Sequence, residues 1–206
     1  ISLASHEHNT PLAGINGYIQ ILERMVRDDQ PGRYLAKTSQ QVKKLTSLVN
    51  DLLDVSKIEA GKLKFELSEI DLCTTIVAAA EMVVEISEGY RIDLKLGQQA
   101  CMVMADEQRI EQVLTNLMSN AIKYSPGGGN IEVILQTKDG MALVGISDQG
   151  MGIPKEKMGQ LFSRFYRVNE NTPNISGLGI GLYLSREIVT RHQGETWAES
   201  ELGVGS

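Results

Sequence analysis

Near the start of the chain, an imidazole, a carboxylate and a hydroxyl stand close together. His6 is followed at once by Glu7, and Thr10 and Pro11 come four and five residues after it. In a helix, residues four apart share a face, so His6 and Thr10 would lie side by side. Glu7 lies about 100° round the helix from His6, near enough to orient the ring or take a proton from it. The segment therefore predicts a reactive histidine beside a base, although a solvated surface histidine is the alternative when the segment is taken alone.

A second group of polar side chains follows one flank of a helix expected over residues 106–123, with Asp106 as its N-cap. The predicted core face of this helix is apolar and comprises Ile110, Val113, Leu114, Leu117 and Ala121. Within about 80° of one another on the flank lie Arg109, Gln112, Asn116, Asn120 and Lys123. Amide oxygens can ligate Mg²⁺, and cations can pair with phosphate. The flank is either an ordinary polar face or part of a metal–phosphate site.

Two glycine motifs and a basic, aromatic segment come later. Asp148 ends a predicted strand and opens Asp148-Gln149-Gly150-Met151-Gly152-Ile153-Pro154, where a carboxylate could accept from a purine amino group and glycines permit close backbone approach. The second motif, Gly177-Leu178-Gly179-Ile180-Gly181-Leu182, leads into a helix whose first N–H groups suit phosphates. Between them, a predicted lid carries an apolar anchor and cations that could reach a γ-phosphate; it contains Phe162, Arg164, Phe165, Tyr166 and Arg167.

The elements that must position His6 are two long helices. Apolar residues at spacings of three and four predict a helix over residues 1–27, a polar break at 28–32 and a second helix from about 33 to 59, with Gly61 as its C-cap. A short loop makes the pair an antiparallel hairpin. Two helices cannot enclose their own apolar stripes, so a second copy should complete a four-helix bundle. The alternative is that residues 1–60 pack against the rest of the same chain.

From residue 62 the periodicity changes to that of a mixed structure. Alternation at Leu63, Phe65 and Leu67 predicts a strand, followed by a helix over 72–88 and strands over 91–96 and 101–104. A hairpin is expected from 131–136 and 142–147 around Asp139-Gly140, then an irregular region over 148–177, a helix over 178–192 and a strand near 196–199. Because strands and helices do not alternate regularly, residues 70–206 are predicted to form an α+β sandwich.

Composition narrows the function classes. The chain has 206 residues, 42% hydrophobic and 22% charged, as in a globular protein of one large or two small domains. The net charge of −6 argues against nucleic acid or an anionic membrane as the partner. Cys73 and Cys101 match no metal-ligand spacing and no disulfide framework, so a reducing interior is expected. The abrupt start at Ile1, without a long apolar run or signal peptide, predicts an excised fragment whose membrane segments, if any, are missing N-terminal ones.

Jointly, these motifs stand in the order and spacing of one family. The chain resembles the catalytic half of the bacterial sensor histidine kinases of two-component systems. Residues 5–12 are similar to the H box, 106–124 to the N box, 148–152 to the G1 box, 161–167 to the F box and 177–182 to the G2 box, and 203–206 resemble a late glycine turn.

The resemblance implies a fold, an activity and partners. Residues 1–60 would be the dimerisation and histidine-phosphotransfer domain, 61–69 a linker and first strand, and 70–206 an ATP-binding domain of the gyrase/Hsp90-like (Bergerat) fold, an α+β two-layer sandwich. The expected activity is ATP-dependent autophosphorylation of a histidine, followed by transfer to an aspartate of a response-regulator receiver domain. The fragment would be cytoplasmic and homodimeric through residues 1–60, with its parent protein anchored in the inner membrane.

The resemblance also implies roles for residues. His6 matches the histidine that attacks the γ-phosphate of ATP, Glu7 the general base, and Thr10 a residue that helps dephosphorylate the response regulator. Asn120 matches the Mg²⁺ ligand, Asp148 the adenine-reading carboxylate, and Arg167 a cation that stabilises the transferring phosphoryl group. The remaining expected nucleotide contacts are Asn116, Lys123, Tyr124, Gly150, Gly152, Ile153, Gly177, Leu178, Gly179, Gly181 and Leu182.

This chain departs from the family pattern at three places. His8 and Asn9 replace an aliphatic and a basic residue, so His8 competes as acceptor. His6 is preferred because it alone has the carboxylate at +1, the threonine at +4 and the proline at +5. Asn9 removes a charge, which predicts slower transfer or altered partner contacts. The sequence also stops where the family continues into a last strand.

Two other functions compete with the kinase. An ATP-hydrolysing relative would need a glutamate where this chain has Asn116, an amide that cannot act as a base. A non-enzymatic dimer that only binds nucleotide is disfavoured because the acceptor and the nucleotide motifs are intact.

Overall fold

The computed structural model describes residues 15–22, 24, 29–85, 89–97, 99–125, 128–168 and 178–206. It divides into two compact units, residues 1–63 and 64–206. Residues 1–14 and 169–177 lie outside the described part, and with them the predicted roles of His6, Glu7, Thr10 and Gly177, as do His8 and Asn9.

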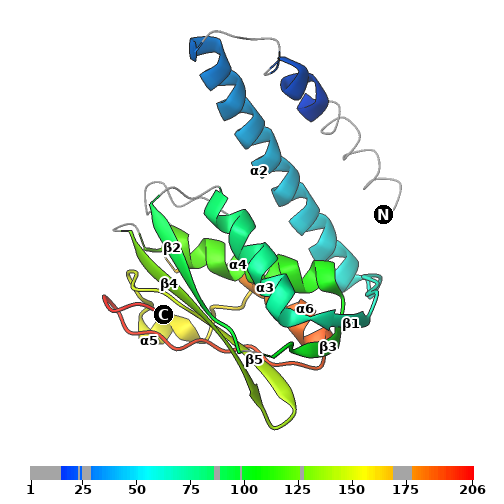
Figure 1. Cartoon of the computed structure of the whole chain (residues 1–206), viewed down its shortest axis with the longest axis vertical. Helices are drawn as coiled ribbons and strands as arrows, with labels where there is room; N and C mark the ends of the chain where they lie inside the picture. Colours follow the sequence, from blue (N-terminus) through cyan, green and yellow to red (C-terminus); the bar gives the residue numbers. More distant parts are fainter. Residues whose placement is uncertain are drawn as a thin grey trace. The chain divides into compact units, whose positions relative to one another are not determined.

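The first unit is helical. Residues 15–22 form a helical segment, and α2 runs from Asp29 to Glu59 (Figure 1). The predicted start near residue 33 is therefore wrong: α2 begins at Asp29, because Pro31 lies in the first turn, where its missing N–H costs no intrahelical bond. The predicted cap at Gly61 is confirmed. Gly61 has a φ of 64°, its N–H donates to Ile58 O at 2.9 Å, and Lys62 N–H donates to Lys57 O at 2.8 Å, a Schellman motif.

The second unit contains two small sheets. In one, β1 (Ser68–Asp71) pairs antiparallel with β3 (Met102–Ala105). In the other, β2 (Tyr90–Lys95) runs parallel to β4 (Gly129–Lys138), which pairs antiparallel with β5 (Met141–Ser147). The predicted hairpin is confirmed: Asp139 and Gly140 have φ values of 53° and 78°, as a two-residue turn of type I′ requires.

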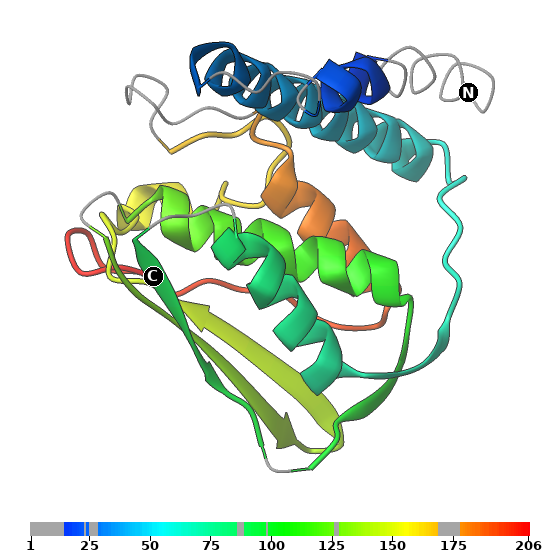
Figure 2. The ribbon, with the colours of Figure 1, turned by 45° about the horizontal axis from the view of Figure 1, so that its top comes forward.

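Three helices cover one face of the larger sheet. These are α3 (Leu72–Glu85), α4 (Glu107–Lys123) and α6 (Gly181–Arg191), seen together in Figures 1 and 2. The core between the layers contains Ile76, Met118 and Val133, all fully buried. On α4 the predicted core positions Val113, Leu114 and Ala121 are buried, whereas Ile110 and Leu117 are half-buried. Met118 takes the central place instead, because it belongs to the same cluster as the inward side chains of α3. A helical first unit, followed by a unit with helices on one face of a mixed sheet, confirms the expected helical region and α+β two-layer sandwich.

Three predicted elements differ in the structure. Residues 62–67 form no strand, because Glu66 N–H donates to the Asp106 carboxylate at 3.0 Å instead of to a neighbouring strand. The helix expected from Leu178 begins at Gly181, since Gly179 has a φ of 69°. The strand expected near 196–199 is not formed; in that part of the chain the only bridge joins Glu201 and Gly205 among the residues described. A short helix, α5 (Lys155–Met158), interrupts the predicted irregular region.

Within the described residues, no helix combines the length and the apolar character needed to cross a bilayer.

Candidate functional site

Asp106 fixes the start of α4 through several hydrogen bonds besides the predicted N-cap. Its carboxylate accepts from Arg109 N–H at 3.1 Å and from Glu66 N–H at 3.0 Å. Its own N–H donates to His192 Nε2 at 3.0 Å, and His192 Nδ1 lies 2.8 Å from Ile188 O. The ring therefore accepts at Nε2 and donates at Nδ1, as a neutral imidazole does. This node joins the entry to the second unit, the start of α4 and the end of α6.

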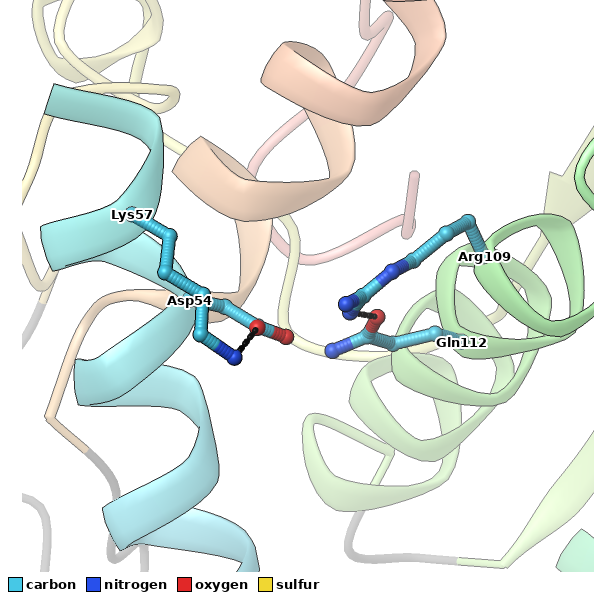
Figure 3. Close-up of polar contacts among 4 residues, drawn as sticks. All are labelled: Asp54, Lys57, Arg109 and Gln112. Atoms are coloured by element: carbon cyan, nitrogen blue, oxygen red, sulfur yellow. Dashed lines mark hydrogen bonds and ion pairs between the residues drawn. The ribbon is translucent and has the colours of Figure 1, made fainter. Parts of the chain in front are cut away.

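The polar flank of α4 is a chain of amides. Asn116 Nδ2 donates to Ser185 Oγ of α6 at 2.8 Å, and Asn120 Nδ2 lies 3.4 Å from Asn116 Oδ1. Asn116 is thus engaged by a neighbouring helix. The amide oxygen of Asn120, by contrast, accepts no hydrogen bond from the described residues. Nearer the start of α4, Arg109 Nη1 donates to Gln112 Oε1 at 2.7 Å; Figure 3 shows this pair, and also the separate ion pair of Lys57 and Asp54 on α2.

The second glycine motif meets this flank. A Cβ added at Gly181 would lie 2.3 Å from Asn116 Oδ1, and one at Gly179 would lie 2.6 Å from Tyr166 O. Glycine is required at both positions so that the start of α6 can approach α4 and the segment at Tyr166. Leu178 is exposed and Leu182 half-buried on either side of these contacts. The motif's described residues therefore place the first N–H groups of α6 beside the amides.

Asp148 lies against the other end of α4. Its Oδ1 accepts from Gly150 N–H at 2.8 Å and lies 3.4 Å from Ser125 Oγ. A Cβ at Gly150 would come within 2.3 Å of Tyr124 O, which also accepts from Met151 N–H at 3.1 Å. The first glycine motif is thus packed on the C-terminal turn of α4. Lys123 extends over the Tyr124 ring at 5.1 Å from its centroid.

Burial alters two titrations here. It raises the pKa of Asp148 above its usual value, while the hydrogen bonds from Gly150 and Ser125 act in the opposite direction. Burial also raises the pKa of Tyr124, and the charge of Arg167 lowers it. The positive charge of Arg167 thus acts on the Tyr124 hydroxyl, while its predicted role toward a phosphoryl group stays a prediction.

The C-terminal residues pack against the first glycine motif. Gly152 has a φ of 65°, and a Cβ on it would lie 2.0 Å from Glu201 O. Ile153 N–H donates to Ser200 Oγ at 2.8 Å, and Ser200 Oγ lies 2.7 Å from Gly205 O. Asp148 and Ser206 also exchange backbone hydrogen bonds of 2.8 and 3.3 Å. Gly152 and Ile153, which were predicted as ligand contacts, thus pack against residues 200 and 201 of the C-terminal segment.

The segment predicted as a lid is anchored on α6 where it is described. Arg164 lies over the Tyr183 ring at 5.6 Å, and Arg186 lies over Phe162 at 5.7 Å. Phe162 is half-buried, whereas Phe165 is 59% exposed and has a positive φ of 58°, an uncommon conformation for a bulky residue. Of the two, Phe162 is the side chain that could anchor the segment, whose role as a lid stays a prediction.

A metal at this site would depend on few protein ligands. Among the described residues, no group of three or more His, Cys, Asp and Glu side chains could hold a metal ion. Mg²⁺ is commonly held by one or two protein oxygens together with water and substrate phosphates, so the unshared amide oxygen of Asn120 fits that ion.

Three serines support the site although the sequence did not predict it: Ser125, Ser185 and Ser200. Each hydroxyl supports a predicted site segment, through Asp148, Asn116 and Ile153 respectively. Serine is common and these residues form no spacing with their partners, so no sequence signal could have identified them.

Family models match both parts of the chain. A family model described as "His Kinase A (phospho-acceptor) domain" matches residues 1–61, and one described as "Histidine kinase-, DNA gyrase B-, and HSP90-like ATPase" matches residues 105–206. The sensor histidine kinase WalK of Bacillus subtilis is 32% identical over 214 residues, which covers 100% of this chain and 35% of the relative.

This chain belongs to the sensor histidine kinases of two-component systems.

Other family members extend the match. Drug sensory protein A of Synechocystis is 32% identical over 221 residues, covering 100% of this chain and 33% of that protein. The chain thus spans about a third of the length of these curated relatives. Among solved structures, the histidine kinase AdeS of Acinetobacter baumannii has a TM-score of 0.64 and 26% identity, covering 97% of this chain and 93% of that one. ShkA in complex with AMPPNP has a TM-score of 0.78 and 26% identity, covering 99% of this chain and 43% of that one.

Proposed function

We propose that this chain transfers the γ-phosphoryl group of ATP to His6 and then passes it to an aspartate of a response-regulator receiver domain. Residues 1–60 would carry the acceptor histidine and the dimer contacts, residues 61–69 would link the two parts, and residues 70–206 would bind the nucleotide. The observation that carries the proposal is the meeting of Asn120, Asp148 and the start of α6 around one helix, α4.

Four parts of the described site have tasks in this proposal. The Asp148 carboxylate accepts from the adenine amino group, and its hydrogen bond from Gly150 keeps it oriented. The first N–H groups of α6 donate to the phosphates, where the positive end of the helix dipole favours negative charge. Asn120 would hold Mg²⁺, which neutralises charge on the phosphates. Arg167 would stabilise charge on the group in transfer.

At the acceptor, His6 would attack the terminal phosphorus while Glu7 takes the proton from its ring. Thr10 would orient the water that later removes phosphate from the response regulator.

Exposed apolar residues support a homodimer through the helical unit. Among the side chains described on its two helical segments, the large apolar ones that are at least 43% exposed are Ile15, Tyr18, Ile21, Leu22, Leu45 and Leu52. Such residues gather at interfaces, and a second hairpin could cover them in a four-helix bundle.

The proposal is tested by incubating the chain with Mg²⁺ and ATP labelled at the γ-phosphate. We expect label that is lost in acid and kept in base, absent from His6→Gln and retained by the matched variant His8→Gln. Release of free phosphate without labelled protein would show an ATPase instead, and binding without either product would show a nucleotide-binding scaffold.

A second experiment examines the return reaction. Thr10→Ala should leave labelling of His6 largely intact and slow the dephosphorylation of the response regulator. An unchanged dephosphorylation rate would remove Thr10 from the mechanism.

A further inference from the structure

Cys73 and Cys101 lie together at one corner of the second unit, where α3 and β3 begin. The Asp71 Oδ1 atom accepts from both of their backbone N–H groups, at 3.1 Å from Cys73 and 2.9 Å from Cys101. Since both nitrogens contact one oxygen atom, they lie within about 6 Å of each other. None of the predicted nucleotide-site residues is part of this corner.

The strand register brings the two residues side by side. Asp71 pairs with Met102 in the β1–β3 ladder, and Leu72 N–H donates to Cys101 O at 3.0 Å, which extends the pairing by one residue. Cys101 therefore faces Leu72, the immediate neighbour of Cys73. Facing Cα atoms in antiparallel pairs are about 4.5–5.5 Å apart, and a disulfide needs a Cα separation of about 4.4–6.8 Å. Cys73 follows Leu72 directly, so its Cα lies about 3.8 Å from the Cα that faces Cys101, and the two cysteines are near neighbours at this corner.

The side chains lie on the same side of this corner. Cys73 Sγ is 3.6 Å from Gln99 O, so it points to the segment that carries Cys101. Both side chains are half-buried and pack against the same hydrophobic cluster. Both cysteines are free thiols in the structure.

We propose that Cys73 and Cys101 are a redox pair that closes into an intramolecular disulfide when the chain meets a low-molecular-weight disulfide such as oxidised glutathione. A thiolate of one cysteine attacks the glutathione disulfide, breaks its S–S bond and releases one reduced glutathione. The second cysteine then attacks the mixed disulfide and displaces the other glutathione. Two protein thiols lose two protons and two electrons, and one glutathione disulfide becomes two glutathione thiols.

The surroundings favour the dithiol as the resting state. Burial raises the pKa of the Cys73 thiol, and the negative charge of Asp71 raises it further. Because the thiolate is the attacking form, the pair should react slowly near neutral pH and survive brief exposure to oxidant.

The test uses the complete chain, reduced and then incubated with oxidised glutathione. Trypsin would place the two cysteines on separate peptides, residues 65–91 and 96–109. We expect these peptides joined under non-reducing conditions, lighter by two hydrogens than their sum, and separated by dithiothreitol. The oxidised chain should also melt at least about 5 °C higher than the reduced one, because the bridge constrains the unfolded chain.

Controls separate this bridge from other oxidation products. Cys73→Ser and Cys101→Ser, and the corresponding alanine variants, should form no linked peptide and show no rise in melting temperature on oxidation. Mixing ¹⁵N-labelled and unlabelled chains tells whether a bridge lies within one chain or between two. The proposal would be overturned if the sole products were glutathione adducts on separate peptides. Linked peptides of mixed isotope content would overturn it as well.

Discussion

The two units of this molecule bury their apolar side chains in different ways. The second unit encloses its own core: Ile76, Met118 and Val133 have no exposed surface between the helices and the sheet. In the first unit, Tyr18 is 72% and Leu45 51% exposed on the helices. The second unit also exposes apolar side chains, such as Trp197 at 60%, but these lie outside an enclosed core. We therefore expect the second unit to be stable by itself, and the first unit to gain stability from the proposed dimer contacts.

The units also differ in how backbone contacts restrict the sequence. In the second unit, glycines at the site touch backbone atoms from distant segments, as Gly152 does with Glu201 and Gly205 with Asp148. At Gly17 in the first unit, an added Cβ would meet nothing within 4 Å. Substitutions should therefore act on packing in one unit and on association in the other.

The largest expected effect is on the second unit. Gly152→Ala puts a Cβ 2.0 Å from Glu201 O at a φ of 65°, so the free energy of unfolding should fall by about 3–5 kcal/mol. Gly159→Ala is the matched control, since Gly159 has a φ of −63° and open space around it. Denaturant unfolding of both variants measures the difference; equal stability would mean that the turn at Gly152 yields easily.

Next in size is an effect confined to association. Leu45→Lys with Leu52→Lys places charge on exposed apolar positions of α2, and should raise the dimer dissociation constant about 100-fold. Ser47→Lys, at an exposed position on the opposite side of the helix, should leave it unchanged. Analytical ultracentrifugation measures both dissociation constants. Nucleotide binding, measured separately, should not change in either variant. A dimer that survives the double substitution would break the contrast between the units.

A smaller effect should come from the node at Asp106. His192→Phe keeps a ring beside Phe65, whose centroid lies 5.3 Å from that of His192, but removes the acceptor for Asp106 N–H. A buried donor left without a partner costs about 1–3 kcal/mol, so thermal unfolding should shift accordingly. An unchanged melting temperature would show that solvent replaces the imidazole.

The smallest expected change in stability comes from replacing Asp148. That substitution should lower the nucleotide affinity instead. Because the folded-state pKa is raised, the contribution of this group to stability is present below its unfolded pKa and is lost as pH rises through the folded value. Asp148→Asn should therefore change the unfolding free energy at pH 7 by no more than about 1 kcal/mol, while nucleotide affinity falls at least about tenfold. In the wild type, affinity should fall as the carboxylate protonates on acidification. Calorimetric titration at several pH values measures the nucleotide affinity. If neither the substitution nor acidification changes that affinity, Asp148 does not take part in adenine binding.

Local patterns were predictable where the physical cause is local. The turn at Asp139-Gly140, the cap at Gly61 and the cap at Asp106 depend on backbone preferences of a few neighbouring residues, and all three are present. The expected strands at 62–67 and 196–199 were wrong because alternation alone does not supply a partner strand.

The sequence by itself determined the family motifs, their order, and the helix that carries Asn116 and Asn120 on one flank. Only the tertiary structure decided what each motif touches: Asn116 meets Ser185 across 69 residues of sequence, and Asp106 meets His192 across 86. The reason is physical. Helical periodicity and turn preferences act over a few residues, whereas the spacing of these partners depends on how whole helices pack against a shared core.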